Sequence, residues 1–162
     1  MNCLNCGAPV AVVEGREHFQ CPYCDSFVFP GDLESSIDRI KPLGQSGERT
    51  CPVCSEALQS GTMEGRTIEY CTLCRGVLLS SDDFLQIVRL RRAQRTQPPD
   101  EPRPLNQEEM NRHVECPVCG KRMEVHPYYG GGSVMIDSCR ACGMVWLDHG
   151  EITVIERAPG RR

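Results

Sequence analysis

The sequence has few of the large side chains that build a hydrophobic core. Aromatic residues account for 6% of its 162 residues, with one tryptophan and four phenylalanines. No apolar stretch approaches the roughly 20 residues that a helix needs to cross a bilayer, so no membrane partner is expected. The amino terminus shows neither the basic region nor the apolar region of a secretory signal. We therefore expect a cytoplasmic protein.

Positive charge is also in short supply. The 18 lysines and arginines are outnumbered by 22 acidic residues, which gives a formal net charge of −4. Nucleic-acid binding normally depends on cations that neutralise phosphates and release counterions. The overall charge thus disfavours a nucleic acid as the partner.

What the sequence does contain is cysteine in a regular pattern. All 12 cysteines fall into Cys-x-x-Cys pairs, and the pairs group along the chain as three sets of four, with none left over. We name the sets site 1 (Cys3, Cys6, Cys21, Cys24), site 2 (Cys51, Cys54, Cys71, Cys74) and site 3 (Cys116, Cys119, Cys139, Cys142).

This spacing is typical of metal ligands. Two residues between paired cysteines allow a tight turn to direct both sulfurs at one ion, and two such turns supply the four thiolates of a tetrahedral zinc site. Gaps of 14, 16 and 19 residues separate the pairs within a set, which suits an antiparallel hairpin. A disulfide framework is disfavoured because secretion is not expected. The predicted cofactor is Zn2+, one ion for each of the three sets, with iron in a four-thiolate site as the alternative.

The predicted fold is a small metal-bound α+β protein of three zinc ribbons, in which antiparallel β-hairpins join the zinc knuckles and short helices follow the second and third. The predicted boundaries are 1–40 for ribbon 1, 46–96 for ribbon 2 with its helix, 97–112 for a Pro-rich linker with a short helix, and 113–158 for ribbon 3 with a carboxyl-terminal helix. Modules this small seldom fold unaided, so we expect zinc, at about 10 to 16 kcal/mol per structural site, to supply the missing stability.

Local patterns place the elements inside each ribbon. Paired hairpin strands are predicted at 10–13 and 18–20, at 57–63 and 67–70, and at 123–127 and 134–137. Capping residues predict helices that begin at Ser80, Asn106 and Asp148, with Glu151 reaching back at the last. The proline-rich linker is expected to be extended and to leave ribbon 3 tethered, while ribbons 1 and 2 could dock across residues 41–49.

The third ribbon carries a resemblance to a known family. The residues are Cys116-Pro117-Val118-Cys119-Gly120, then Asp137-Ser138-Cys139-Arg140-Ala141-Cys142-Gly143, then Val145-Trp146-Leu147-Asp148-His149-Gly150-Glu151-Ile152. They resemble the transcription factor IIB-like zinc-ribbon family. The resemblance implies that the four cysteines hold zinc, with Trp146 beside the site. Met144 stands where the family commonly has a glycine.

Ribbon 2 is similar to the same family in a weaker form, and ribbon 1 resembles only a generic zinc ribbon. Cys74-Arg75-Gly76-Val77 fits the family pattern, but Leu78 replaces the tryptophan and Ser80 replaces the aspartate. Known members are mostly small prokaryotic proteins of undefined role, so the resemblance implies a zinc-binding fold rather than a particular activity.

A basic cluster is the main candidate for a second kind of site. It comprises Arg89, Arg91, Arg92 and Arg95, near the end of the helix predicted after ribbon 2. One interpretation is a nucleic-acid contact. The favoured interpretation is that these cations offset the helix dipole and remain solvated.

Histidine and acidic residues provide little evidence for catalysis. His18, His113, His126 and His149 are surplus to complete cysteine sets, and Glu14, Glu17 and Glu64 at the hairpin tips lack adjacent paired carboxylates. No catalytic residues are predicted, and we do not expect an enzyme.

The function predicted from the sequence is that of a non-catalytic binding or adaptor module. Four-thiolate sites leave no open coordination position for water or substrate. The expected partner is a protein, with transcription-related machinery as a candidate setting. The alternatives are a DNA- or RNA-binding regulator that uses the face from Arg89 to Arg95, and a redox sensor in which oxidation of the zinc thiolates ejects the metal. The sequence does not define an oligomeric state.

Overall fold

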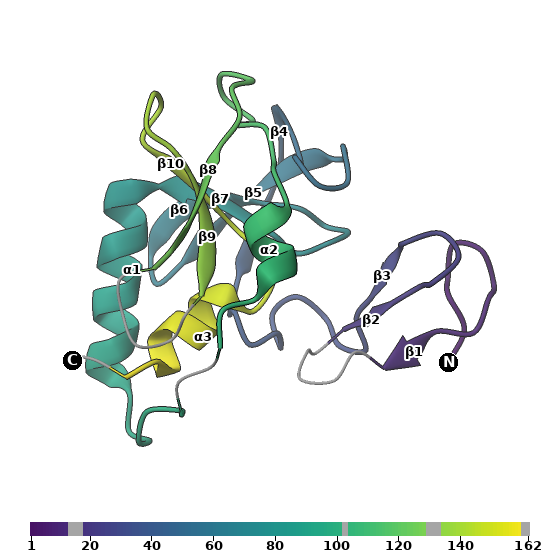
Figure 1. The fold of residues 1–162 in the computed structure, drawn as a ribbon, viewed down its shortest axis with the longest axis horizontal. Coiled ribbons are helices and arrows are strands. Elements are labelled where there is room, and N and C mark those ends of the chain that lie inside the picture. Colours follow the sequence, from purple (N-terminus) through teal and green to yellow (C-terminus); the bar gives the residue numbers. More distant parts are fainter. Residues whose placement is uncertain (13–17, 102–103, 129–133, 160–162) are drawn as a thin grey trace.

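The computed structural model describes residues 1–12, 18–101, 104–128 and 134–159. These residues form two antiparallel sheets and three helices (Figure 1). The elements are β1 (Ala11–Val12), β2 (Phe19–Gln20), β3 (Phe27–Val28), β4 (Lys41–Thr50), β5 (Ala57–Met63), β6 (Arg66–Tyr70), β7 (Val77–Ser80), α1 (Ser81–Gln94), α2 (Gln107–Asn111), β8 (Glu124–Pro127), β9 (Met135–Cys139), β10 (Met144–Leu147) and α3 (Glu151–Arg157). Small antiparallel sheets with short helices confirm the predicted α+β class of zinc ribbons.

Ribbon 1 has a sheet of its own, which lies to one side of the rest of the molecule in Figure 1. Its strands follow the order β1-β2-β3, and each is only two residues long. Phe19 of β2 pairs with Val12 on one side and with Val28 on the other. The predicted hairpin tip from Glu14 to Glu17 lies outside the described residues.

Ribbons 2 and 3 share one seven-stranded sheet in the order β4-β5-β6-β7-β10-β9-β8. They join where β7 pairs antiparallel with β10. The expectation that ribbon 3 is only tethered is therefore wrong, because a backbone ladder connects it to ribbon 2. The four predicted domain boundaries are not tested by this arrangement and remain a prediction.

The linker between these ribbons is held at both ends. The backbone N–H of Asp100 donates a 2.8 Å hydrogen bond to the carbonyl of Arg157, at the end of α3. At the other end, α2 begins after Asn106, whose side chain accepts from the N–H of Glu108 as the capping pattern predicts. Arg112, directly after α2, forms ion pairs with Asp137 and Asp148 of ribbon 3.

The core lies on both faces of the shared sheet and is completed by two helices. One buried cluster gathers residues of β5, β6, β7 and β10 against α1 and α3, including Ile87 and Ile155. A second cluster contains cysteines of both site 2 and site 3, together with Leu58, Leu78 and Trp146. Sites 2 and 3 are therefore part of the hydrophobic core of the two-ribbon body.

Several element predictions are confirmed and two are corrected. Strand β5 spans the predicted residues, and Ser80 caps α1 by accepting from the N–H of Asp83 at 3.1 Å. The segment 41–49, predicted as a connection between ribbons 1 and 2, is instead part of β4 and pairs with β5. Asp148 does not cap α3: the N-cap residue is Gly150, although Glu151 does accept from the N–H of Asp148 at 2.8 Å, as predicted.

No helix in the described part of the chain is long and apolar enough to span a bilayer.

Candidate metal centres

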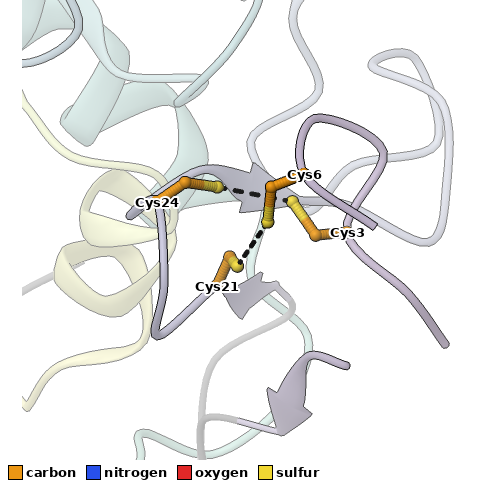
Figure 2. A group of neighbouring side chains, drawn as sticks. All are labelled: Cys3, Cys6, Cys21 and Cys24. Atoms are coloured by element: carbon orange, nitrogen blue, oxygen red, sulfur yellow. Dashed lines mark hydrogen bonds between the residues drawn. The ribbon is translucent and has the colours of Figure 1, made fainter. Parts of the chain in front are cut away.

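Each predicted cysteine set comes together in space. Within each of the three sets, the Sγ atoms all lie within 4.8 Å of one another. Figure 2 shows site 1, where the four sulfurs point toward a common centre from two separate knuckles. The distances from Cys3 to Cys24 and from Cys6 to Cys21 are 3.6 and 3.5 Å between Sγ atoms. All 12 cysteines are free thiols, and these separations far exceed a disulfide bond of about 2.05 Å.

One backbone turn builds all six knuckles. The N–H of the residue after the second cysteine donates to the carbonyl of the first cysteine, at 2.8 to 3.0 Å. That residue has a φ between 55° and 73° in every knuckle. The residues in this position are Gly7, Asp25, Ser55, Arg75, Gly120 and Gly143. The three glycines signal a left-handed conformation in the sequence, whereas aspartate, serine and arginine give a weaker signal or none.

The sulfur geometry fits tetrahedral zinc. A tetrahedron with Zn–S bonds of about 2.3 Å has edges of about 3.8 Å between sulfurs. The distances from Cys51 to Cys74 in site 2 and from Cys119 to Cys139 in site 3 are both 3.6 Å. Backbone N–H groups of Val53 and Cys54 also point at the Cys51 sulfur, at 3.4 and 3.3 Å. The three sets therefore fit three zinc ions, one for each set.

The electrostatics of site 2 also favour a cation. Hydrogen bonds with Cys51 and Cys54 lower the pKa of Cys71, whereas hydrogen bonds with the same two thiols raise the pKa of Cys74. The values move apart because four sulfurs in this small buried volume cannot all become anions when no positive charge is near. A divalent ion at their centre removes that conflict and allows all four to bind as thiolates.

The three sites differ in how far solvent reaches them. Sites 1 and 3 each have one exposed cysteine, which is Cys6 in site 1 and Cys119 in site 3. Site 2 has none, since Cys51, Cys71 and Cys74 are buried and Cys54 is half-buried. A backbone hydrogen bond at Lys121 lowers the pKa of Cys119 to about 7, so this exposed thiol ionises near neutral pH.

The four arginines predicted as a possible nucleic-acid contact do not form a free basic face. Arg91 is fully buried and forms ion pairs with Glu64 and Glu156, and its guanidinium also donates to the carbonyl of Asp38. Both Arg92 and Arg95 donate to backbone carbonyls near the end of α3. Of the four arginines, only Arg89 is exposed. The expectation that these cations remain solvated is thus wrong for Arg91 and Arg92.

The predicted surplus histidines are not part of any cysteine set. Among the described residues, the clusters of metal-binding donors consist of cysteine alone. His18 and His149 are buried between ribbon 1 and ribbon 3, with ring centroids 6.0 Å apart, and both contact Phe29. Their role in the structure is therefore packing at the junction between these ribbons.

Segment 30–40 fastens ribbon 1 to the two-ribbon body, and sequence reasoning missed it. Asp38 is buried, and its carboxylate accepts from the hydroxyl of Thr153 at 3.0 Å and lies 3.3 Å from Nδ1 of His149. From ribbon 2, the guanidinium of Arg75 donates to the carbonyls of Gly31 and Asp32. Nothing in the sequence around Asp38 indicates that this aspartate contacts ribbon 3.

Comparison with known families agrees with this geometry. The family described as transcription factor zinc-finger matches residues 50–90 and 115–157, which contain sites 2 and 3. Site 1 lies outside both matches. No curated protein and no solved structure shows significant similarity to the chain. Because the two matched segments together span more than half of the sequence, the chain belongs to the transcription factor zinc-finger family.

Proposed function

We propose that the protein is a non-catalytic adaptor, in which three zinc ions hold the ribbons in shape and exposed ribbon surface binds a protein partner. The observation that carries this proposal is the completeness of the sites. Each of the three sets offers four cysteine ligands from the chain itself. A closed four-thiolate site leaves no position for a substrate or an activated water, so its contribution is structural.

The knuckles of ribbon 1 offer the most exposed apolar side chains. Leu4, between the cysteines of the first knuckle, is 94% exposed, and Tyr23, in the second knuckle, is 74% exposed. Apolar and aromatic side chains that stand out of a rigid turn are suited to the pockets of a protein partner. The knuckles of ribbons 2 and 3 also present an apolar side chain each, Leu73 and Val118, but these are less exposed.

The arginine cluster that the nucleic-acid alternative requires is mostly engaged in contacts within the protein. Of the cluster from Arg89 to Arg95, three guanidinium groups are engaged by α3, by segment 30–40 or by Glu64. These contacts neutralise or bury the charges that would otherwise release counterions from a phosphate backbone. A protein is therefore the favoured partner, with transcription-related machinery as the candidate setting.

The redox alternative has one supporting observation, the exposure of Cys6 and Cys119. Exposed thiolates are the ones that oxidants reach first. A redox sensor would release zinc at peroxide concentrations that leave the methionines intact, and mass spectrometry would locate the modification at these two residues. Zinc release only under general oxidation of the chain would exclude this alternative.

Affinity capture with matched variants tests the adaptor proposal. The tagged, zinc-loaded protein is expected to retain a reproducible protein partner from cells, and the double variant Leu4→Ser with Tyr23→Ser is expected to lose it. The control is Leu85→Ser with Leu90→Ser, which removes two exposed leucines from α1 (44% and 41% exposed) and leaves ribbon 1 unchanged. Equal capture by all three proteins, or an intrinsic reaction with no partner, would overturn the proposal.

A further inference from the structure

The junction between ribbons 2 and 3 has a local two-fold axis. Strands β7 and β10 occupy equivalent places, since Val77 and Val145 each stand three residues after the last cysteine of their site. The register pairs Val77 with Leu147 and, reciprocally, Leu79 with Val145. At the centre, Leu78 pairs with its own equivalent, Trp146. The axis therefore passes between Leu78 and Trp146.

The side chains around this axis are not symmetric in size. Trp146 is fully buried and covers Gly76 so closely that a Cβ added to this glycine would lie 2.2 Å from Cζ2 of the indole. Real Cβ atoms do not approach that closely, so only glycine fits beneath the ring. The indole Nε1 donates to Asp148 at 3.2 Å, which fixes the ring in this orientation.

The positions related to Trp146 and Gly76 by the two-fold axis hold side chains of intermediate size. The two-fold axis relates Trp146 to Leu78 and Gly76 to Met144, since the last two stand two residues after the final cysteine of their sites. Leu78 is buried, and Met144 is partly buried against the same cluster. The register sets Met144 diagonally opposite Leu78, at a spacing where long side chains meet. A large residue thus faces the smallest one on one side, and two intermediate residues face each other on the other side.

We propose that these four residues are a pairing code that makes ribbon 2 and ribbon 3 specific partners for each other. The surface of β7 fits a ribbon that presents an indole at the central position, and the surface of β10 fits a ribbon that presents a leucine. Two copies of ribbon 3 would bring two indoles onto two methionines and overfill the junction. Two copies of ribbon 2 would place leucines over glycines and leave a cavity.

Packing energies support a code of this kind. Overfilling a well-packed core is destabilising, and a large-to-small change that leaves a cavity is destabilising as well. Backbone strain does not account for the choice of residues, because neither Gly76 nor Met144 has a positive φ. Strands β7 and β10 already pair with each other within the chain, so an external partner binds elsewhere. This inference concerns assembly and does not depend on the proposed adaptor function.

An exchange of the four residues tests the code in the full-length, zinc-loaded protein. The ribbon 2 half-exchange is Gly76→Met with Leu78→Trp, and the ribbon 3 half-exchange is Met144→Gly with Trp146→Leu. We expect each half-exchange to lower the Tm by about 5 to 10 °C. The complete exchange restores the complementary volumes across the two-fold axis and is expected to recover at least half of the larger loss.

A milder double-mutant cycle covers the case in which a half-exchange fails to fold. Gly76→Ala is expected to lower the Tm, and Trp146→Leu in the same chain is expected to relieve most of that loss. The matched control is Gly61→Ala in β5, whose Cβ would meet the ring of Tyr70 in the other core cluster, so its effect should add to that of Trp146→Leu. Additive effects at Gly76, together with a complete exchange no more stable than its worse half, would overturn the code.

Discussion

Asp38 and Gly150 are 112 residues apart in the sequence, yet Oδ2 of Asp38 accepts a 2.7 Å hydrogen bond from the backbone N–H of Gly150. Gly150 is the N-cap residue of α3 and supplies no side chain to satisfy the free N–H groups of the first turn. Asp38 provides that acceptor from segment 30–40. The carboxylate therefore caps a helix of ribbon 3 and anchors ribbon 1 at the same time.

Removal of this carboxylate should loosen the junction. Asp38→Ala leaves the buried Gly150 N–H without its acceptor and the Thr153 hydroxyl with the Ile37 carbonyl alone, so we expect a loss of about 2 kcal/mol in unfolding free energy. Asp38→Asn keeps one acceptor and should lose less. Urea unfolding of the zinc-loaded protein measures both, and Asp32→Ala, at an exposed residue of the same segment, is the control. Equal losses at Asp32 and Asp38 would contradict the capping role.

The arginines of α1 should separate into structural and surface residues. Arg91 is fully buried and pairs with Glu64 and Glu156, so Arg91→Ala removes its buried packing and leaves the half-exposed Arg39 as the cation that pairs with both carboxylates; we expect a cost of about 3 kcal/mol. Arg89 is exposed, and Arg89→Ala should change stability by no more than about 0.5 kcal/mol.

Thermal unfolding measures this difference, and a titration with duplex DNA at low salt completes the test. We expect both variants to behave as the parent protein does in that titration. A large loss of DNA affinity in Arg89→Ala, with no change in stability for Arg91→Ala, would restore the basic face as a functional surface.

Glu151 should make stability depend on pH in a defined direction. Partial burial, together with repulsion from Asp148, raises the pKa of Glu151 well above its ordinary value. The folded state therefore keeps this proton to higher pH than the unfolded state, and the contribution of Glu151 to stability falls as pH rises above its unfolded pKa of about 4.3. Glu151→Gln retains an acceptor for the Asp148 N–H and removes this penalty.

We expect the stability difference between Glu151→Gln and the parent protein to shift in favour of the variant as pH rises from 5 to 7.5. Comparing the two proteins at each pH cancels the pH dependence of the zinc sites, because both have the same cysteines. Urea midpoints at matched zinc concentration provide the measurement. A difference that moves in favour of glutamate with rising pH would show that the sign is wrong.

Zinc should leave the three sites at different rates. Site 1 lies in a sheet of two-residue strands and has an exposed cysteine. Sites 2 and 3 both pack in the core of the two-ribbon body, but only site 3 has an exposed cysteine. With a chromogenic chelator in excess, we expect site 1 to release zinc first, site 3 next and site 2 last. Cys6→Ser should remove the fastest phase and Cys119→Ser the second. A single phase for all the zinc would contradict this order.

The cysteine pattern predicts the sites well because the information is local. A Cys-x-x-Cys pair and its turn lie within five residues, and the strands of ribbon 2 alternate or end at recognisable turns, so β5 has its predicted bounds. The same holds for the N-cap at Ser80, where one side chain and one N–H three residues later decide the start of α1.

The arrangement of the ribbons could not be predicted because its determinants are far apart in sequence. Strand β4 contains Pro42, Gly44 and Gly47 with no alternation of apolar residues, and only its pairing with β5 makes it a strand. The apolar runs in β7 and β10 predict that both strands are buried, but they do not indicate that the two strands pair with each other. The linker prolines predicted that ribbon 3 is separate from ribbon 2, but β7 and β10 pair and join the two ribbons in one sheet.

Native mass spectrometry of protein purified without added metal, before and after strong chelation, tests the central claim most directly. The account predicts a compact chain that carries three zinc ions with 12 deprotonated cysteines, and an expanded, unfolded chain once the metal is removed. A compact chain without metal, or one whose cysteines are joined as disulfides, would contradict it.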